Sequence, residues 1–266
     1  MLMNESWSGG VFGERGQCIL APNPGIMSLD GTNTWVLREP GARRSVVIDP
    51  GPLDEGHLDA VAEAAGEVAT VLLTHHHYDH SEAARAFAER VGAGVRALDP
   101  EYRLGTEGLG DGDVIEVDGL EIRVVGTPGH TSDSLSFWLP ADGAVLTGDT
   151  VLGRGTTVVA HPDGELGAYL DSLDRLHALA SEHGVGSVWP GHGPVIGNAL
   201  GALDYYIAHR RERLGQVEDA LSGLGATPAD ADPRAIVEIV YADVDQVLWG
   251  AAELSVRAQL AYLAER

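Results

Sequence analysis

The stretch Thr74-His75-His76-His77-Tyr78-Asp79-His80 holds the densest group of metal-binding side chains in the sequence. It follows the apolar run 71–73, which is typical of a buried β-strand, and it precedes Ser81, which we expect to cap the next helix. Three adjacent histidines could also form a solvated loop. Their place at the end of a predicted strand favours a metal site, because such edges of α/β sheets commonly carry ligands.

The spacing within the stretch fits the pattern His-x-His-x-Asp-His. Alternate residues at a strand end point the same way, so His75 and His77 can converge on one cation. Asp79 and His80 come where the chain turns and are free to face a second cation. Imidazole and carboxylate groups are both ligands of zinc, so the pattern predicts a zinc-type site.

Three further candidate ligands each follow a short apolar run and lie in a glycine-containing turn. They are His130 in Thr-Pro-Gly-His-Thr, Asp149 in Leu-Thr-Gly-Asp-Thr and His192 in Trp-Pro-Gly-His-Gly. One such turn alone would carry little weight. Because all three follow predicted strands, we expect their side chains to meet those of the histidine stretch at one sheet edge.

Short apolar runs and helical patterns alternate over the first 200 residues, which predicts a layered α/β architecture. Strands are expected at 35–37, 45–48, 71–73, 122–125, 144–146 and 187–189, and helices at 58–65, 83–91 and 166–180. From about residue 203 the pattern is helical only, with segments through 221, over 233–240 and from 251 to the end; Thr227-Pro228 also suits a helix start. We therefore expect a catalytic domain over 1–200 and a small helical appendage over 201–266.

The composition excludes several classes of chemistry. The 266 residues include 40 acidic and 17 basic side chains, giving a formal net charge of −23, and every basic residue is arginine. Without lysine, Schiff-base and P-loop phosphate chemistry are excluded. The charge opposes binding to duplex DNA, to polyanions in general and to anionic membranes. Cys18 is the only cysteine and is expected to be buried and inert; no leader or membrane span is evident, so we expect a cytoplasmic protein.

These motifs, together with Asp49 in Ile-Asp-Pro-Gly, resemble the metallo-β-lactamase superfamily in their order along about three quarters of the chain. The resemblance implies a four-layer αββα sandwich with two metal ions at one edge. It implies that His75, His77 and His130 bind one zinc, that Asp79, His80 and His192 bind the other, and that Asp149 bridges both. Asp49 would orient the ligands from outside, and His76 would not be a ligand.

Many true lactamases of this superfamily have a cysteine where Asp149 stands, so lactam hydrolysis is a minor alternative. The chain more closely resembles the β-lactamase-like protein 2 group, in Asn23-Pro24-Gly25, in Gly31-Thr32-Asn33-Thr34 and in Gly153-Arg154-Gly155-Thr156-Thr157. That group implies a winged-helix-like C-terminal appendage. It includes both RNA-cleaving enzymes and thioesterases that release polyketides, so the resemblance predicts mechanism better than substrate.

The function expected from these observations is hydrolysis by a hydroxide that bridges two Zn²⁺ ions, with Mn²⁺ or iron as other possible metals. Asp79 is a candidate for orienting the hydroxide or passing on its proton. The substrate is either a small-molecule ester or thioester or single-stranded RNA. The resemblance suggests donors to the substrate from Asn33, Thr34, Arg154, Thr156 and Thr157, although loop polarity alone explains these residues equally well.

Other polar features have less specific interpretations. His57, His161, His177, His183 and His209 are expected on the surface. The basic run 209–213 could hold a phosphate, but a solvated face paired with acids is the commoner reason for such a run. A metal-binding scaffold with a partner-binding appendage is the non-enzymatic alternative. Duplex DNA is not an expected partner, because the segment 235–242 has no basic residue.

Overall fold

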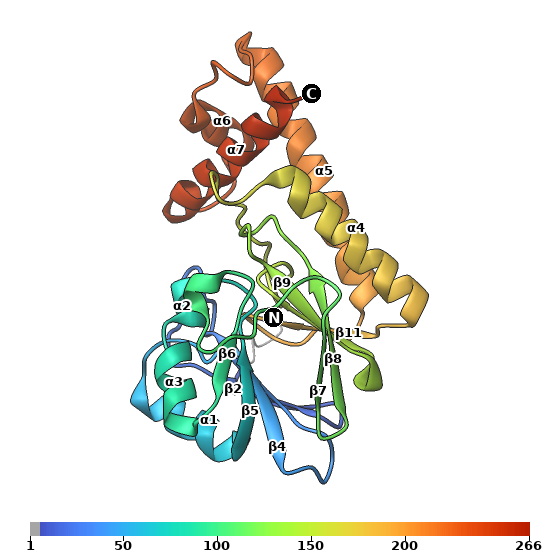
Figure 1. The fold of residues 1–266 in the computed structure, drawn as a ribbon. Coiled ribbons are helices and arrows are strands. Elements are labelled where there is room, and N and C mark those ends of the chain that lie inside the picture. Colours follow the sequence, from blue (N-terminus) through green and yellow to red (C-terminus); the bar gives the residue numbers. More distant parts are fainter. Residues whose placement is uncertain (1–5) are drawn as a thin grey trace.

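The computed structural model describes residues 6–266 and contains two β-sheets in its N-terminal part (Figure 1). The first sheet has the order β1-β2-β3-β4-β5-β6, formed by Gly10–Phe12, Gly16–Leu20, Asn33–Leu37, Arg44–Ile48, Glu67–Leu72 and Gly94–Arg96. The second has the order β11-β10-β9-β8-β7, formed by Ser187–Pro190, Ala144–Gly148, Leu135–Leu139, Leu120–Gly126 and Val114–Val117. All six strands expected from the sequence are present.

Helices cover the outer face of each sheet and continue into the C-terminal part. Helices α1, α2 and α3 span Glu55–Ala65, Tyr78–Ser81 and Ala84–Val91; α4, α5, α6 and α7 span Leu166–His183, Ala199–Leu224, Pro233–Val240 and Trp249–Ala264. Three short 3₁₀ turns lie at Pro100–Tyr102, Pro140–Asp142 and Gln246–Leu248. Figure 1 shows α5 running from the second sheet to α6 and α7, which lie away from the first sheet.

Three hydrophobic cores make this a four-layer sandwich. The core between the sheets combines Trp35 and Ile48 of the first sheet with Phe137 and Trp189 of the second. Val47 and Val71, on the other face of the first sheet, pack with Leu58 of α1 and Phe87 of α3; Val145 and Val188 of the second sheet pack with Leu173 of α4 and Leu203 of α5. Alternate strand residues therefore serve different cores, and the expected αββα fold is confirmed.

A fourth core holds the C-terminal helices together. It joins Val217 and Leu221 near the end of α5 to Ile236 of α6 and Val256 of α7. The helix expected over 233–240 has these bounds in the structure, and the last helix begins two residues earlier than expected. The division at residue 200 stays a prediction, since α5 contributes to the core beneath the second sheet as well as to this one.

Two expected helix starts are wrong. Ser81 lies inside the short helix α2, where its Oγ donates to the carbonyl of His76 at 2.8 Å, because the chain coils immediately after His77. Thr227 begins a turn, with its Oγ1 donating to Asp230 at 2.8 Å. Helix α6 begins at Pro233, where Asp232 accepts the backbone N–H of Arg234. Among the described residues, no helix has the length and apolar character needed to cross a membrane.

Candidate metal centre

The seven side chains expected as ligands gather at one edge of the sandwich. His75 and His77 follow β5, Asp79 and His80 lie on α2, and the other three follow strands of the second sheet: His130 after β8, Asp149 after β10 and His192 after β11. Strands β10 and β11 are parallel, and β8 runs in the same direction through its antiparallel neighbour β9. Their carboxyl ends therefore share an edge, as the sequence predicted.

The first cluster consists of three imidazoles. Ligand atoms of His75, His77 and His130 all lie within 4.8 Å of one another. Nδ1 of His77 is 3.0 Å from Nε2 of His130, and Nε2 of His75 is buried without any hydrogen-bond partner. Three imidazole nitrogens that converge in this way, one of them without a hydrogen-bond partner, are suited to share a cation.

The second cluster combines two imidazoles with a carboxylate. Ligand atoms of Asp79, His80 and His192 lie within 4.8 Å of one another. Nε2 of His192 is 3.1 Å from Oδ2 of Asp79 and 3.2 Å from Nε2 of His80. The two nitrogen atoms face the same point as the carboxylate oxygen, which is a donor set for a second divalent cation.

Asp149 lies between the two clusters. Its Oδ2 is 3.4 Å from Nε2 of His192 and 3.8 Å from Nε2 of His130, while its Oδ1 is 3.5 Å from Nε2 of His80. Oδ1 is buried and has no hydrogen-bond partner. A carboxylate in this place can give one oxygen to each of two cations, so the residues fit a dinuclear site.

A layer of hydrogen bonds behind the clusters aims the imidazoles inward. Nδ1 of His80 donates to Asp49 at 2.9 Å, Nδ1 of His130 to the carbonyl of Val158 at 2.8 Å, and Nδ1 of His192 to the carbonyl of Gly31 at 3.0 Å. Once a ring is neutral, this bond leaves the lone pair of its Nε2 free to bind a cation.

Asp49 and Thr74 complete this outer layer. Oδ1 of Asp49 accepts from the backbone N–H of Thr74 at 2.8 Å and Oδ2 from the Thr74 hydroxyl at 2.6 Å, and Nδ1 of His75 donates to that hydroxyl at 2.9 Å. Asp49 has a φ of 50°, a left-handed conformation that aspartate tolerates better than most residues. Both of its oxygens are used by these partners, so its geometry is that of a support rather than of a ligand.

The electrostatics divide the site into two halves. Burial lowers the pKa of His75 and His130 and lowers that of His77 to about 4, which keeps these rings neutral. Burial also lowers the pKa of His80, but Asp79, Asp149 and Asp49 outweigh it and raise it to about 9. Cations that bind to the second cluster must displace this proton, so binding to that cluster is linked to proton release.

A pocket opens beside the metal centre. It has a volume of about 430 Å³ and is bounded by His130 and Asp149, by loop residues 26–29 and 152–158, and by side chains of α5 and α7. Its walls are largely apolar and include Ile26, Leu29, Leu152, Val244 and Leu248; Arg154, Arg210 and Arg213 also line it. A substrate held here would lie between the sandwich and the C-terminal helices.

Of the five residues expected to contact the substrate, three line this pocket and two are buried elsewhere. Arg154, Thr156 and Thr157 line this pocket. Asn33 and Thr34 are completely buried: the amide of Asn33 donates to the carbonyls of Pro190 and Gly193, each at 2.9 Å, and Thr34 donates to the carbonyl of Asp49. Their expected contact with substrate does not fit the structure, because the amide of Asn33 joins the two sheets and the hydroxyl of Thr34 is bound to the carbonyl of Asp49.

Two surface assignments are also wrong. His57 is only 4% exposed, and its Nε2 lies 2.9 Å from Oγ1 of Thr34 behind the metal centre. In the basic run, Arg211 is exposed as expected, but Arg210 is 4% exposed. His76 lies outside the ligand clusters and pairs with Asp133 at 2.8 Å, and Cys18 is buried, as expected.

Sequence reasoning missed two residues that act on the ligands. Thr74 orients His75, and Thr32 places its hydroxyl 3.4 Å from Oδ2 of Asp79. Both lie in motifs recognised from the sequence. A hydroxyl residue directly before the first ligand was the available signal for Thr74, whereas the approach of Thr32 depends on a bridge between its backbone and that of His192, 160 positions later.

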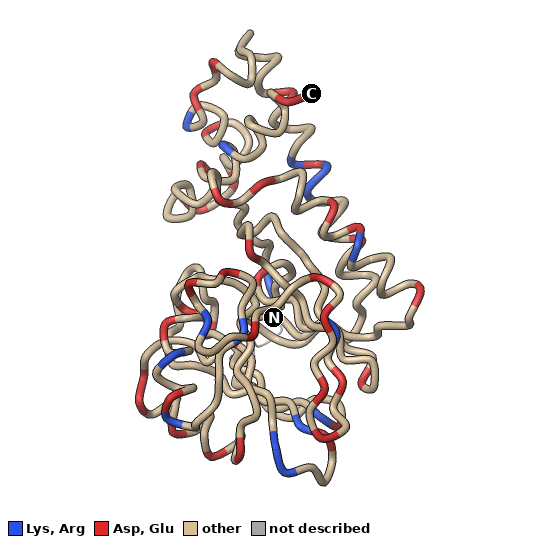
Figure 2. Tube along the Cα trace, in the orientation of Figure 1, with Lys and Arg blue, Asp and Glu red and all other residues tan. Residues whose placement is uncertain are grey.

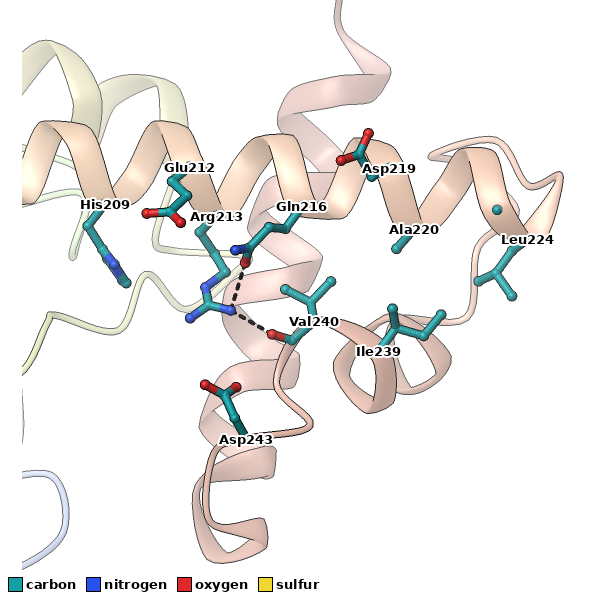
Figure 3. A pocket seen from close by; sticks show the side chains of 11 residues that line it. His209, Glu212, Arg213, Gln216, Asp219, Ala220, Leu224, Ile239, Val240 and Asp243 are labelled. Atoms are coloured by element: carbon teal, nitrogen blue, oxygen red, sulfur yellow. Dashed lines mark hydrogen bonds between the residues drawn. The ribbon is translucent and has the colours of Figure 1, made fainter.

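A second pocket lies on the C-terminal part, between α5 and α6 (Figure 3). Its volume is about 700 Å³, and His209 and Arg213 line both this pocket and the one beside the metal centre. Arg213 is held by hydrogen bonds from Nη1 to Gln216 at 2.9 Å and to the carbonyl of Val240 at 2.6 Å. The residues that line this pocket also include the acids Glu212, Asp219 and Asp243.

Comparison with known families gives two matches along the chain. Residues 27–182 match the metallo-beta-lactamase superfamily, and residues 233–266 match the beta-lactamase associated winged helix domain. The first match covers more than half of the chain. The second falls on α6 and α7, the helices that pack with the end of α5 in the C-terminal core.

Individual proteins agree with these matches. A beta-lactamase-like protein 2 homolog of Drosophila melanogaster is 30% identical over 270 residues, covering 92% of this chain and 86% of that protein. An atrochrysone carboxyl ACP thioesterase of Aspergillus fumigatus is 37% identical over 215 residues, covering 77% of this chain and 64% of that protein, so the match spans less than two thirds of that relative.

Among solved structures, a metallo-beta-lactamase family protein from Thermus thermophilus has a TM-score of 0.75 at 24% identity, covering 93% of this chain and 92% of that one. This likeness extends over both the sandwich and the C-terminal helices. The fold, the grouped histidines and aspartates, and the family matches agree: the chain belongs to the metallo-beta-lactamase superfamily of metal-dependent hydrolases and carries its associated C-terminal winged helix domain.

Proposed function

We propose that this chain hydrolyses thioesters of small acyl groups, using two divalent cations, with zinc as the proposed metal. His75, His77 and His130 would hold one cation, Asp79, His80 and His192 the other, and Asp149 both. Bound cations of this kind lower the pKa of water and polarise a carbonyl oxygen. The observation that carries the proposal is the largely apolar pocket of about 430 Å³ that reaches His130 and Asp149.

The reaction needs groups that hold the substrate and move a proton. Water would add to the thioester carbonyl, the C–S bond would break, and the thiol would leave with a proton, giving one carboxylic acid and one thiol. Asp79 is the most exposed carboxylate of the centre, with 35% of its side chain accessible, so we assign it the transfer of the water proton. The hydroxyl of Thr32 beside it would keep that carboxylate in place.

A small acyl substrate agrees better with the charge of the molecule than RNA does. The net charge is −23, and Figure 2 shows acidic residues in every part of the described chain. Binding of a phosphate backbone draws on clustered cations. The relative named as an ACP thioesterase acts on a thioester by its name, which also supports this substrate class.

The test compares substrates on the metal-loaded protein. We expect turnover of acyl thioesters, measured by thiol release, no cleavage of single-stranded RNA, and about two metal ions per chain. Asp149→Ala should lower the metal content and abolish turnover. Asp204→Ala is the matched control, because Asp204 pairs with His177 on the outside of α4 and α5.

Other outcomes would select other functions. Cleavage of RNA without thioester turnover would replace the proposed substrate. Binding of metal without hydrolysis of any thioester, ester or lactam would favour a non-enzymatic scaffold.

A further inference from the structure

Arg210 is a buried cation in the wall of the substrate pocket. It lies on α5, is 4% exposed and lines the pocket that reaches His130 and Asp149. Its guanidinium lies over the ring of Tyr169, with Cζ 5.0 Å from the ring centre, and its Nη2 donates to the carbonyl of Thr157. Both partners are neutral groups.

The charge of Arg210 has no counterion within the described part of the protein. Its Nε is buried without a hydrogen-bond partner, and no carboxylate among residues 6–266 forms an ion pair with it. Arg15, whose side chain is only 12% exposed, does have counterions. It pairs with Glu39 at 2.6 Å and with Asp142 at 3.2 Å. A buried cation without an opposite charge is unfavourable, so an unpaired one beside a pocket indicates an anionic ligand.

A purely structural role does not account for this charge. Arg210 connects α5 to loop 150–157, but Tyr206 on the same helix already does so, by accepting the backbone N–H of Leu152 at 2.8 Å. A neutral donor would serve that purpose at lower cost than a buried guanidinium.

The position of Arg210 relative to the metal centre suggests the length of the ligand. Thr157 accepts from Arg210 through its carbonyl and donates from its hydroxyl to the carbonyl of Asp149 at 2.7 Å. One residue thus links the cation to the backbone of Asp149, whose carboxylate lies between the two metal-binding clusters. A short acyl chain can span from the cation to this carboxylate, with its stem against Leu152 and Leu248 on the apolar walls.

We propose that Arg210 binds a free carboxylate at the far end of the acyl group, so that the substrates are thioesters of short dicarboxylic acids. The planar guanidinium matches a carboxylate through two parallel hydrogen bonds. Nη2 already donates to Thr157 and Nε is enclosed by protein, so Nη1, which forms no hydrogen bond within the described residues, is the donor left for a ligand. This assignment of the acyl group rests on the proposed function, whereas the binding of the acid itself does not.

Binding is tested without turnover, on the metal-loaded protein. Melting temperature is followed against concentration for dicarboxylates of four to six carbons and for monocarboxylates of equal length. Both series have the carboxylate that approaches the metals. The difference in affinity between the two series therefore measures the contribution of the second carboxylate. We expect the best dicarboxylate to bind about tenfold or more tightly than its monocarboxylate, which is the range of a charge-assisted hydrogen bond.

Variants assign this difference to one side chain. Arg210→Gln should remove the preference, and Arg210→Lys, which keeps the charge, should retain part of it. Arg211→Gln is the matched control, because it removes the same charge from the same helix at an exposed position, and it should keep the full preference. Equal binding of the two series to the wild-type protein overturns the proposal even if the Arg210 variants do not fold.

Turnover separates this proposal from the proposed function. With N-acetylcysteamine thioesters, which carry no phosphate, the glutaryl compound should exceed the pentanoyl compound about tenfold or more in kcat/KM, and Arg210→Gln should equalise them by slowing only the glutaryl substrate. Thioester turnover with no preference for glutaryl overturns the role of Arg210 alone. A dicarboxylate preference in binding, without any thioester turnover, supports the anion site and overturns the proposed function.

Discussion

Gly191 packs so closely against the metal centre that a side chain cannot fit there. A Cβ at this position would lie 2.5 Å from Oδ1 of Asp149 and 2.8 Å from Cε1 of His80. We therefore expect Gly191→Ala to displace Asp149 and to lower metal affinity by about 10- to 100-fold, the range seen when groups that support ligands are lost. Metal content after dialysis against a buffered series of free zinc concentrations measures the change.

Gly197→Ala provides the control in the same loop, because a Cβ at Gly197 meets no atom within 4 Å. It should bind metal as the wild type does. Normal metal affinity in Gly191→Ala would mean that Asp149 tolerates displacement and is not needed between the two clusters.

The lowered pKa of His57 leads to a prediction of how the stability of the protein depends on pH. Burial lowers its pKa below the ordinary value of 6.5, so the unfolded chain binds a proton at a pH where the folded chain does not. This contribution to stability is present above pH 6.5 and is lost as the pH falls through the lowered pKa. His57→Gln cannot take up that proton, so the free energy of unfolding of the metal-loaded variant should fall less steeply between about pH 7 and pH 5.

Urea unfolding of both metal-loaded proteins at half-unit pH intervals measures how their free energies of unfolding fall with pH. The fall in the wild type should exceed that in the variant by at most about 1.4 kcal/mol per unit of pKa shift. Equal slopes would show that the ring of His57 is hydrated and titrates as in the unfolded chain. NMR of the imidazole nitrogens gives the folded pKa independently.

Among single residues, the sequence predicted the ligands better than the buried polar groups. His130, Asp149 and His192 could be recognised because each follows an apolar run in a glycine turn. His57 and Arg210 have no such signal. His57 is buried by Thr34, and Arg210 by contacts with Tyr169 and Thr157, none of which is near it in the sequence.

Loop 150–157, which carries much of the pocket, is held by tyrosines of two helices. The hydroxyl of Tyr169 on α4 donates to the carbonyl of Thr150 at 2.6 Å, and that of Tyr206 on α5 accepts from Leu152 N–H at 2.8 Å. Tyr206→Phe leaves that buried N–H without its partner, so we expect a loss of about 1–3 kcal/mol in the free energy of unfolding.

Urea unfolding of Tyr206→Phe, with Tyr205→Phe as its neighbour and control, tests this expectation. Tyr205 is 56% exposed, so loss of its hydroxyl should change stability by less than about 0.5 kcal/mol. Equal stability of the two variants would mean that water or another acceptor satisfies Leu152 in place of Tyr206.

The elements that sequence reasoning found are those with long apolar patterns. The helix over Pro233–Val240 was predicted with its bounds from its helical pattern of apolar residues. The strands that were missed include Gly10–Phe12 and Gly94–Arg96, which have only three residues each and contain glycine. Such edge strands exist because a neighbour pairs with them, and their own composition does not show it.

At the scale of the whole molecule, α5 connects the second sheet to the C-terminal domain. Leu203 and Tyr206 near its start pack beneath the second sheet, whereas Val217 and Leu221 pack with α6 and α7. Residues of α5 and α7 also line the pocket beside the candidate metal centre. The C-terminal part is thus one wall of the candidate site, and a change there can alter which substrates enter.

The proposed boundary at residue 200 can be tested by comparing two truncated chains. Residues 1–200 lack Leu203 and Tyr206, so α4 and Val188 lose their cover, and we expect this chain to aggregate or to melt well below the full protein. Residues 1–226 keep α5 and should retain the sandwich core, but they expose the apolar face around Val217 and Leu221. Circular dichroism melting and size-exclusion chromatography distinguish them. A cooperative, monomeric 1–200 chain that binds two metal ions would confirm the boundary and show that α5 is needed for the pocket alone.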